Sequence, residues 1–355
     1  MAENIKVIAD KSEIVAIADA VRSKTNTTKD MSLGEIVSGI NGIEAGITPT
    51  GTISISENGT YNVEDYASAE VNVASSGGNY EIEDALIAGT ITEYTNSKVE
   101  TVRTYAFYQC TSLTSINLPA CTTISASAFQ GCTSLTTVNL PACTTVSTNA
   151  FYSCTSLTTA DFPACTTIGA FAFRSCSSLT TVSLPVCTSI GSSAFLNCSS
   201  LTSINLPVCT TIGSSAFYGC DSLTSINLPA CTTINNHAFY YCDSLTTVSL
   251  PVCTSIGGNV FNGCISLTTV SLPACTYMSG NAFRSCHNLV SLYLTGSTLC
   301  SLAGGSTTFL STPIYGYSTV AGRYGYIYVP ASLLTAYKAA TGWSHFADRI
   351  LAYDA

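Results

Sequence analysis

A strict 22-residue period runs through the middle of the chain and limits its possible folds more than any other feature. Phenylalanine recurs at every 22nd position from Phe107 to Phe283, leucine recurs from Leu113 to Leu289, and a proline column follows the same step. One unit of this length cannot bury its own apolar side, whereas stacked units share a continuous core. The period therefore predicts a solenoid of stacked, similar turns of chain.

Each unit begins with the pattern of a short strand. The first complete unit reads LTSINLPACTTISASAFQGC from Leu113 to Cys132. Its apolar residues first alternate with Ser and Asn, as in a half-buried strand, and Pro119 ends that strand because proline has no N–H. With Cys121 in its last position, the first half matches L-x-x-L-x-L-x-x-N/C, the signature of leucine-rich repeats. The chain is therefore predicted to be an α+β repeat protein, a leucine-rich-repeat solenoid with a parallel β-sheet.

The eighteen cysteines follow the same period. One column runs from Cys110 to Cys286 and a second from Cys121 to Cys275, while Cys300 lies 22 residues after Met278, in a column of aliphatic residues. All of these positions face inward, where a free cysteine behaves as a small hydrophobic residue. In-register side chains point in parallel, whereas a disulfide needs a twisted geometry, and no C-x-x-C metal motif occurs. We therefore expect eighteen buried, free thiols.

Low charge excludes one class of partner. Charged residues make up only 9% of the chain, against roughly 25% in ordinary globular domains. Between residues 101 and 294 three acids balance three bases. Such a surface cannot neutralise phosphates, so nucleic acid is excluded as a partner. The chain starts without a signal-peptide pattern and has no apolar stretch that could span a membrane, so we expect cytoplasmic synthesis and no membrane insertion.

No catalytic arrangement emerges from the sequence. His237, His287 and His345 fall at unrelated positions of the repeat, and neither a glycine-rich phosphate loop nor a Ser-His-Asp arrangement is present. Asp221 and Asp243 share a column one repeat apart, and paired carboxylates are the equipment of a glycosidase. They also follow a repeat cysteine, where other repeats hold Thr or Ser, so we favour turn residues. We predict that the protein is not an enzyme and uses no metal or cofactor.

Positions that vary between repeats are the best candidates for binding. The outward strand positions form a monotonous ladder of Ser, Thr and Asn, interpreted chiefly as a plain polar surface, with glycan or ice binding as alternatives. The two positions after each repeat phenylalanine vary more and are bulky. They hold Tyr108, Tyr152, Arg174, Leu196, Tyr218, Tyr240, Tyr241 and Arg284. Tyr and Arg are enriched at interface centres, although Tyr also serves simply to cover a turn.

The regular pattern ends after Leu294. Thr295 replaces the repeat proline and Gly305 replaces the repeat phenylalanine, so we expect the solenoid to stop there. A helix capped by Ser332 and ending at Gly342 is expected to close it. Before this helix, a Gly-, Ser-, Thr- and Tyr-rich segment resembles an antibody contact loop in composition and is either decoration or a binding surface. Its candidate binding residues are Tyr315, Tyr317, Arg323 and Tyr324.

Short modules are predicted to flank the solenoid. We divide the chain into a helical attachment module at 1–46, a small β-hairpin module at 47–74, a linker at 75–80, the solenoid at 81–296, and a loop and cap at 297–355. In the first module, residues 12–23 and a segment opened by a capping box at Ser32 each have one apolar helical face. Asn58 and Gly59 predict the hairpin turn. Helices this short cannot form a core alone, so residues 1–74 are expected to dock on other copies or another protein.

Residues 91–294 resemble the BspA-like (Treponema-type) leucine-rich repeats. Almost every unit follows L-x-x-I-x-L-P and then I-x-x-x-A-F-x-x-C, with departures at Ala160 and Phe162 and with cysteine throughout at the N/C position. The resemblance implies a bacterial surface or adhesion protein that binds molecules of a host or a neighbouring cell. The family offers no catalytic residues that could be transferred to this chain.

The two ends of the chain carry a second resemblance. The segments IADAVRSKT from Ile17 and SENGTYNVEDY from Ser56 are similar to parts of tail and other structural proteins of phages and prophages of gut Gram-positive bacteria. The segment YVPASLLTAYKAAT from Tyr328 resembles C-terminal caps found in the same proteins. This resemblance implies attachment at the front of the chain and recognition behind it.

These features predict a phage or prophage tail-associated receptor-binding protein that recognises a bacterial cell-surface glycan or protein. Residues 1–74 would attach it to other tail or structural proteins, a homo-oligomer is expected, and the location would be the virion. A bacterial surface adhesin is the first alternative. A structural subunit that assembles into filaments is the second, and ice binding is a distant fourth hypothesis.

Overall fold

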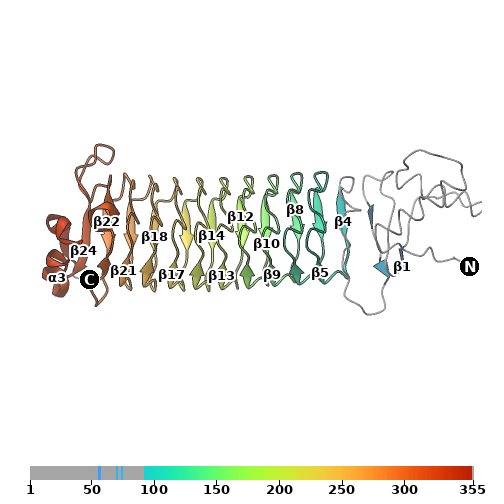
Figure 1. Cartoon of the computed structure of the whole chain (residues 1–355), viewed down its shortest axis with the longest axis horizontal. Coiled ribbons are helices and arrows are strands. Elements are labelled where there is room, and N and C mark those ends of the chain that lie inside the picture. The colour runs from blue at the N-terminus through green and yellow to red at the C-terminus, as the bar shows by residue number, and fades with distance from the viewer. Residues whose placement is uncertain (1–54, 57–68, 71–72, 75–91, 354–355) are drawn as a thin grey trace, which may run out of the picture.

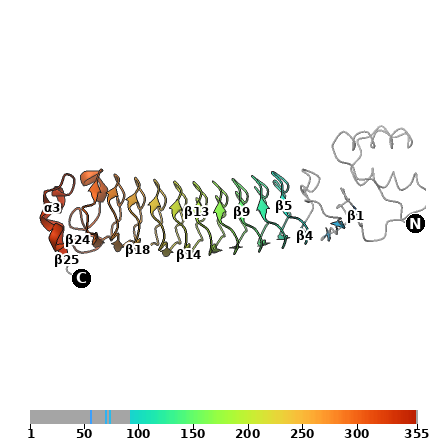
Figure 2. The ribbon, with the colours of Figure 1, turned by 90° about the horizontal axis from the view of Figure 1, so that it is seen from below.

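The computed structural model describes residues 55–56, 69–70, 73–74 and 92–353. From residue 92 the chain winds into a rod of stacked turns, and each turn adds one strand to each of two parallel sheets (Figures 1 and 2). Only one α-helix occurs in the described part, in the C-terminal cap. The predicted leucine-rich-repeat solenoid is confirmed.

The first sheet contains the three-residue strand that begins each repeat. In the strand at 203–205 the middle residue, Ile204, is buried and its two neighbours are exposed, as the alternating pattern predicts. Backbone bonds such as Thr158 N to Thr136 O, at 3.3 Å, link the sheet across positions where strand pairing is interrupted. The strands are β4 (Glu93–Thr95), β6 (Ser115–Asn117), β8 (Thr137–Asn139), β10 (Thr159–Asp161), β12 (Thr181–Ser183), β14 (Ser203–Asn205), β16 (Ser225–Asn227), β18 (Thr247–Ser249), β20 (Thr269–Ser271) and β22 (Ser291–Tyr293).

The second sheet contains ten two-residue strands in chain order. The second residue of each strand is buried, so one aliphatic side chain per repeat enters the core from this side. The strands are β5 (Thr101–Val102), β7 (Thr123–Ile124), β9 (Thr145–Val146), β11 (Thr167–Ile168), β13 (Ser189–Ile190), β15 (Thr211–Ile212), β17 (Thr233–Ile234), β19 (Ser255–Ile256), β21 (Tyr277–Met278) and β23 (Ser301–Leu302).

A tight turn around the repeat phenylalanine forms the third side of the rod. Two left-handed residues enclose each Ala-Phe pair, for example Ser193 with φ 54° and Asn197 with φ 60°. The turn directs the phenylalanine inward, where Phe195 stacks on Phe173 and Phe217 with ring centroids 5.2 and 5.3 Å away. This ladder gives the stack its spacing and fills the core along its length.

All eighteen cysteines are buried and carry free thiols. In one column the thiol donates to a carbonyl of the preceding repeat, as Cys198 Sγ does to Phe173 O at 3.1 Å. In the other column it donates two residues along, as Cys187 Sγ does to Ser189 O at 3.3 Å. A cysteine therefore fills a small core position and also satisfies a backbone acceptor, which explains its use in nearly every repeat.

Cys300 does not occupy the column that the sequence predicts for it. Leu302 occupies that column instead and pairs with Met278. The two residues are 24 positions apart rather than 22, because the connection between strands β21 and β23 is two residues longer than in the other repeats. Cys300 is buried against Cys275, and their Sγ atoms lie 3.2 Å apart. The prediction of an inward-facing cysteine is right, but its column is wrong.

Stacking continues beyond Leu294, where the 22-residue spacing ends. Phe309 adds a further ring to the ladder, 5.8 Å from Phe283 and nearly parallel to it. Strand β24 (Tyr326–Pro330) then pairs with β22, and β25 (Ile350–Tyr353) pairs with β24. The expectation that the solenoid stops after Leu294 is therefore wrong, because longer connections are accommodated outside an unbroken core.

A small cap closes the C-terminal end. Its short helices are η1 (Gly305–Phe309), η2 (Ala331–Leu333), α3 (Leu334–Ala339) and η3 (Ser344–Arg349). Tyr337 accepts a hydrogen bond from the Cys300 N–H at 2.9 Å, and Trp343 Nε1 donates to Cys300 O at 2.6 Å. The predicted cap at Ser332 is wrong, because α3 begins at Leu334 after a 3₁₀ turn and neither helix has a side-chain cap.

Short strands also precede the first repeat. They are β1 (Ile55–Ser56), β2 (Ala69–Glu70) and β3 (Val73–Ala74). Strand β2 pairs in parallel with β4 and so extends the first sheet, while β1 pairs in parallel with β3. The predicted helices within 1–46, the Asn58-Gly59 turn and the linker at 75–80 lie outside the described residues.

Candidate functional site

The residue after each repeat phenylalanine projects from the turn side of the rod. We call this column, together with Tyr241, the turn ridge. The left-handed residues beside each Ala-Phe pair fix the direction of these side chains, because the backbone has little freedom there. The candidate residues Tyr108, Tyr152, Arg174, Leu196, Tyr218, Tyr240, Tyr241 and Arg284 are all at least partly exposed on it.

An aromatic cluster occupies the C-terminal half of the turn ridge. Tyr218 and Tyr240 stack with centroids 5.0 Å apart, and Tyr241 packs edge-on against Tyr240 at 4.3 Å. Tyr241 is 47% exposed and has φ 57°, a left-handed conformation that glycine adopts in the repeats on either side. The ring lies against Gly263, and a Cβ atom at that position would come within 2.3 Å of Tyr241 Cδ1. The glycine therefore makes room for the ring.

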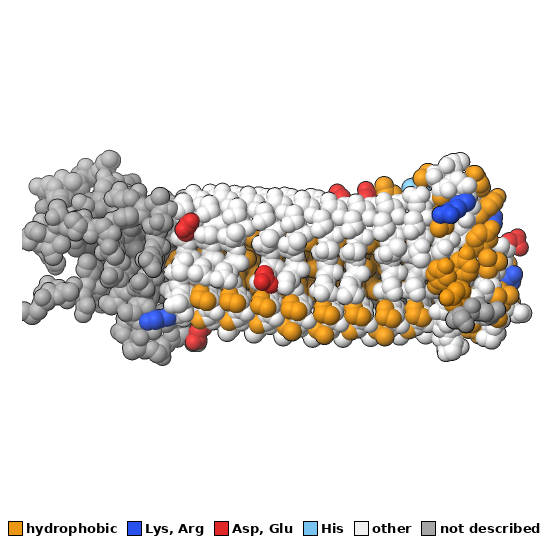
Figure 3. Space-filling model, turned by 180° about the vertical axis from the view of Figure 1, so that it is seen from behind, with side chains coloured by type: hydrophobic (Ala, Val, Ile, Leu, Met, Phe, Trp, Pro, Cys, Tyr) orange, Lys and Arg blue, Asp and Glu red, His pale blue; other side chains and the backbone are white. Residues whose placement is uncertain are grey.

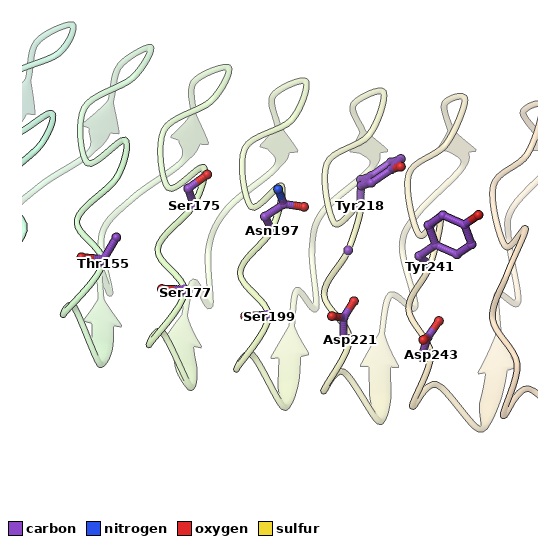
Figure 4. Close-up of a pocket in the computed structure, with 10 residues that line it drawn as sticks. Thr155, Ser175, Ser177, Asn197, Ser199, Tyr218, Asp221, Tyr241 and Asp243 are labelled. Carbon is purple, nitrogen blue, oxygen red and sulfur yellow. The ribbon is translucent and has the colours of Figure 1, made fainter.

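A groove of about 620 Å³ runs beside this cluster. Figure 4 shows two rows of side chains along it, with Asp221 and Asp243 adjacent in the lower row and both carboxylates directed towards the upper row. The complete lining is Thr155, Ser175, Ser177, Asn197, Ser199, Tyr218, Gly219, Asp221, Tyr241 and Asp243. Apart from the two carboxylates, the lining is uncharged and carries hydroxyl, amide or aromatic groups.

No basic group among the described residues shifts the pKa of either carboxylate downward. Burial raises the pKa of Asp221, and burial together with the negative charge of Asp221 raises the pKa of Asp243. A neighbouring cation would lower both values. A hydrogen bond with Tyr241, followed by burial, raises the pKa of Tyr240. The groove is thus a locally acidic, aromatic site on a rod that is otherwise almost free of charge.

A second, smaller depression lies nearer the N-terminal end of the same side. It has a volume of about 290 Å³ and is lined by Gln130, Asn149, Tyr152, Phe171 and Arg174. The Arg174 guanidinium carbon lies 5.6 Å from the centroids of both the Tyr152 and Phe171 rings. Its Nε is buried and makes no hydrogen bond within the described part of the chain. The turn side therefore offers one cationic and one acidic aromatic depression.

The tyrosine-rich segment of the cap forms a separate surface. Tyr317 and Tyr324 meet edge-on at 5.3 Å, and the Arg349 guanidinium covers Tyr324 at 3.6 Å. Tyr315 packs near His345, with centroids 5.6 Å apart, and remains 42% exposed. Arg323 is exposed beside this cluster. These residues do not line the groove, so the predicted binding residues divide between two surfaces.

The sequence-based candidates account for only part of the groove. It contains Tyr218 and Tyr241, which were selected, but also Asn197, which was not considered, and Asp221 and Asp243, which were interpreted as turn residues. That interpretation describes their backbone position correctly. One sequence feature could have identified them. Thr or Ser changes to Asp in two successive repeats, and the same two repeats carry tyrosine after their phenylalanine.

The strand faces look different from the turn side. Threonine hydroxyls bond to the preceding repeat, as Thr202 Oγ1 does to Thr180 O at 3.2 Å, 22 residues earlier. Asn227 Nδ2 similarly donates to Asn205 Oδ1 at 2.7 Å. Figure 3 shows a broad uncharged surface with a stripe of hydrophobic side chains along one edge. Much of the polar ladder thus serves the stack itself.

Two further observations limit the chemistry of the described residues. Within 92–353 and the short described strands before it, no group of three or more His, Cys, Asp or Glu side chains is arranged to hold a metal ion. No helix in these segments is long and apolar enough to cross a membrane.

Several known proteins share features with this chain. A leucine rich cell surface protein of Faecalibacterium prausnitzii is 20% identical over 79% of this chain and 91% of its own, with a TM-score of 0.40. The pneumococcal vaccine antigen PcpA is 15% identical over 78% and 85%, with a TM-score of 0.41. A T. pallidum leucine rich repeat protein is 29% identical over 49% and 73%, with a TM-score of 0.36.

A search of curated proteins found no match. The family described as BspA type leucine rich repeat region, in contrast, matches residues 100–211 and 210–303, which is more than half of the chain. The match covers the repeats whose sequence pattern, stacked strands and phenylalanine ladder are described above. The chain therefore belongs to the BspA-type leucine-rich-repeat family.

Proposed function

We propose that this protein is a non-enzymatic binding protein whose rod presents the turn side to a partner on a cell surface. The observation that carries the proposal is the exposed cluster of Tyr218, Tyr240 and Tyr241 beside the acidic groove. Tyrosine provides a large, rigid contact area at low entropic cost, and it is enriched at interface centres. The strand faces, in contrast, are repetitive and offer little that could distinguish one ligand from another.

The finer proposal is a phage or prophage tail-associated receptor-binding protein. The resemblance of the segments from Ile17 and Ser56 to tail proteins favours it. In this proposal residues 1–74 attach the chain to other tail proteins, the rod recognises a bacterial surface glycan or protein, and the virion is the location. A homo-oligomer would allow several weak sites to act together.

A bacterial surface adhesin is the second candidate. Membership of the BspA-type family favours it, because the resemblance to this family implies a bacterial surface or adhesion protein. In this case the same groove would face a host or neighbouring cell. A filament subunit, the third possibility, would use the uncharged rod face for self-association.

Binding of the purified full chain to bacterial and host cells tests the common part of the proposal. We expect saturable binding to one cell type, weakened when Tyr240 and Tyr241 are replaced by Asn and Gly, the residues found one repeat later at 262 and 263. The matched control is Tyr277→Thr, because Tyr277 is 42% exposed on strand β21, outside the groove, and threonine stands in the same column at 233. Failure of the unmodified chain to bind any cell contradicts the proposal.

Deletion of residues 1–80 separates the tail hypothesis from the adhesin. The tail hypothesis expects the shortened chain to bind cells but to be absent from particles. Loss of cell binding instead contradicts the assignment of the front as an attachment module. Light scattering tests the third possibility, because a small oligomer of fixed size agrees with receptor binding, whereas fibres of indefinite length favour the filament.

A further inference from the structure

We propose that the groove holds an extended, uncharged glycan that lies along the rod, with one sugar unit facing each repeat. This inference rests on the proposed binding function and specifies its ligand. The sugar rings would stack on Tyr241 beside Tyr218, and ring hydroxyls would donate hydrogen bonds to Asp221 and Asp243.

The first argument is the direction and period of the groove. Its lower row takes one side chain from each successive repeat, from Thr155 through Ser177 and Ser199 to the two aspartates (Figure 4). Neighbouring repeats in this region are 5.2–5.3 Å apart, measured between stacked phenylalanine rings. That distance is comparable to the length that one pyranose adds to an extended chain. Successive sugars can therefore meet equivalent partners.

The second argument is the prepared position of Tyr241. Its ring is 47% exposed, yet Tyr240 supports its edge at 4.3 Å and Gly263 leaves the space in which it lies. A ring held in place before binding loses little conformational entropy when a ligand covers it. The face of a pyranose carries C–H groups, which pack on an aromatic ring, while its edge carries hydroxyls that point to the sides of a groove.

The third argument concerns charge. Asp221 and Asp243 are acceptors for which the described residues from 92 to 353 show no basic partner, and a carboxylate forms stronger hydrogen bonds with hydroxyl donors than a neutral group does. The same two charges repel acidic sugars. Within the described part of the chain, no third His, Cys, Asp or Glu side chain joins this pair. The neutral row from Thr155 to Ser199 suits hydroxyl groups better than it suits a basic peptide.

The test uses the full chain and soluble linear oligosaccharides from the disaccharide to the hexasaccharide, a series that includes one sugar for each of the five repeats along the lower row. The probes are β-1,4-linked glucose and β-1,4-linked N-acetylglucosamine series, studied by ligand-observed NMR and calorimetry. We expect binding that strengthens with chain length. Tyr241→Gly, which suits the left-handed backbone, should weaken it about tenfold or more, and Asp221→Asn with Asp243→Asn should weaken it about three- to tenfold. Tyr277→Thr on strand β21 and Asp161→Asn on strand β10, both outside the groove, should change it less than about twofold.

Three outcomes would overturn the assignment: no binding of either series, binding unaffected by Tyr241→Gly, or salt-sensitive binding of oligolysine that the double Asn variant removes. The last outcome would assign the groove to a basic peptide. Cell binding of the unmodified chain is measured in parallel. Retained cell binding without oligosaccharide binding means that only the ligand assignment is wrong, whereas absent cell binding contradicts the proposed function itself.

Discussion

The strand face and the turn side of this rod share the same period but differ in how far the sequence can vary. On the strand face, Thr202 and its counterparts bond from one repeat to the next, so a change in one repeat removes a bond to its neighbour. On the turn side, the inward Phe195 is held by two stacking partners, but the residue that follows it projects outward. The same turn therefore combines a fixed inner position with a free outer one.

This comparison explains where a repeat protein can carry specificity. Identical residues on the strand face keep the stack regular and leave its surface uniform. Substitution to Tyr or Asp on the turn side leaves the ladder unchanged, and such substitutions in two successive repeats supply the charged and aromatic side chains of the groove. Function can thus be added to one stretch of the rod without altering the fold.

Thiol reactivity provides the largest expected contrast between core and surface. Burial raises the pKa of Cys176 to about 12, and only the thiolate is a good nucleophile. We expect the native chain to react negligibly with an aromatic disulfide reagent at neutral pH, whereas the reduced, denatured chain should titrate close to eighteen thiols. Rapid labelling of the native chain, or about half a dozen thiols in the denatured chain, would show that the buried positions are assigned wrongly.

Cys275 and Cys300 are a pair whose oxidation could reduce that number. Their sulfurs lie 3.2 Å apart, and the hydrogen bond between them lowers the pKa of Cys275 while it raises that of Cys300. Treatment with oxidised glutathione should therefore remove two thiols at most. Mass spectrometry locates the bridge, and the Cys275→Ser variant is the control.

Phe195→Ala tests the inner part of the turn. The substitution opens a cavity in the aromatic ladder, so we expect the unfolding free energy to fall by about 3–5 kcal/mol. Val208→Ala is the matched control, because Val208 is 43% exposed and alanine stands in the same column at 230. Urea denaturation followed by circular dichroism measures both. Similar losses in the two variants would mean that the ladder does not hold the rod together.

Gly263→Ala tests the space reserved for Tyr241. The new Cβ would approach Tyr241 Cδ1 to 2.3 Å at a backbone φ of 82°, so we expect a loss of about 1–3 kcal/mol. Gly131→Ala, with φ 78° and only the flexible Gln109 side chain nearby, shares the backbone strain but not the clash. Adding Tyr241→Gly to Gly263→Ala should recover part of the loss. If all three variants unfold alike, the ring does not depend on the glycine.

Thr202→Val tests the strand-face ladder at a single rung. The variant loses the bond to Thr180 O and should cost about 0.5–1.5 kcal/mol in thermal unfolding. Thr181→Val, on the exposed face of β12 outside that ladder, is the control. A neutral result for Thr202 would mean that water replaces the bond without loss.

The pH dependence of the Asp221 and Asp243 pair should have the smallest effect. Their pKa values are raised above the ordinary 3.8 in the folded chain, so the folded state retains protons that the unfolded state has released. Stability from this pair is therefore present at low pH and lost as the pH rises through the raised values. Glycan binding should change in the opposite direction, because protonation removes the negative charge that strengthens these acceptors. Comparison with the double Asn variant between pH 3 and 7 isolates both effects.

The sequence predicts much of the fold and less of the site. The period assigned the first strand of each repeat, the phenylalanine column and the inward cysteines correctly, because each depends on contacts repeated at a fixed separation. It did not predict the second sheet, whose strands contain only two residues each. It missed Phe309 and the column of Cys300, because longer connections shift the numbering without interrupting the core. It selected Tyr218 and Tyr241, but it did not predict that they line one groove with Asp221 and Asp243. These residues come from two different columns of neighbouring repeats, and only the stacking of the repeats brings the columns together.

By itself the sequence determined that this protein is a stacked rod with an uncharged body, because a regular apolar period has few ways to bury its side chains. Only the tertiary structure decided which variable positions act together. Each tight turn contains residues in the left-handed backbone conformation and stacks on the turn of the next repeat. Side chains from successive repeats therefore lie about one strand spacing apart, a distance of roughly 5 Å. Residues 22 apart in the chain thereby form one groove, and this proximity comes from stacking rather than from any local sequence signal.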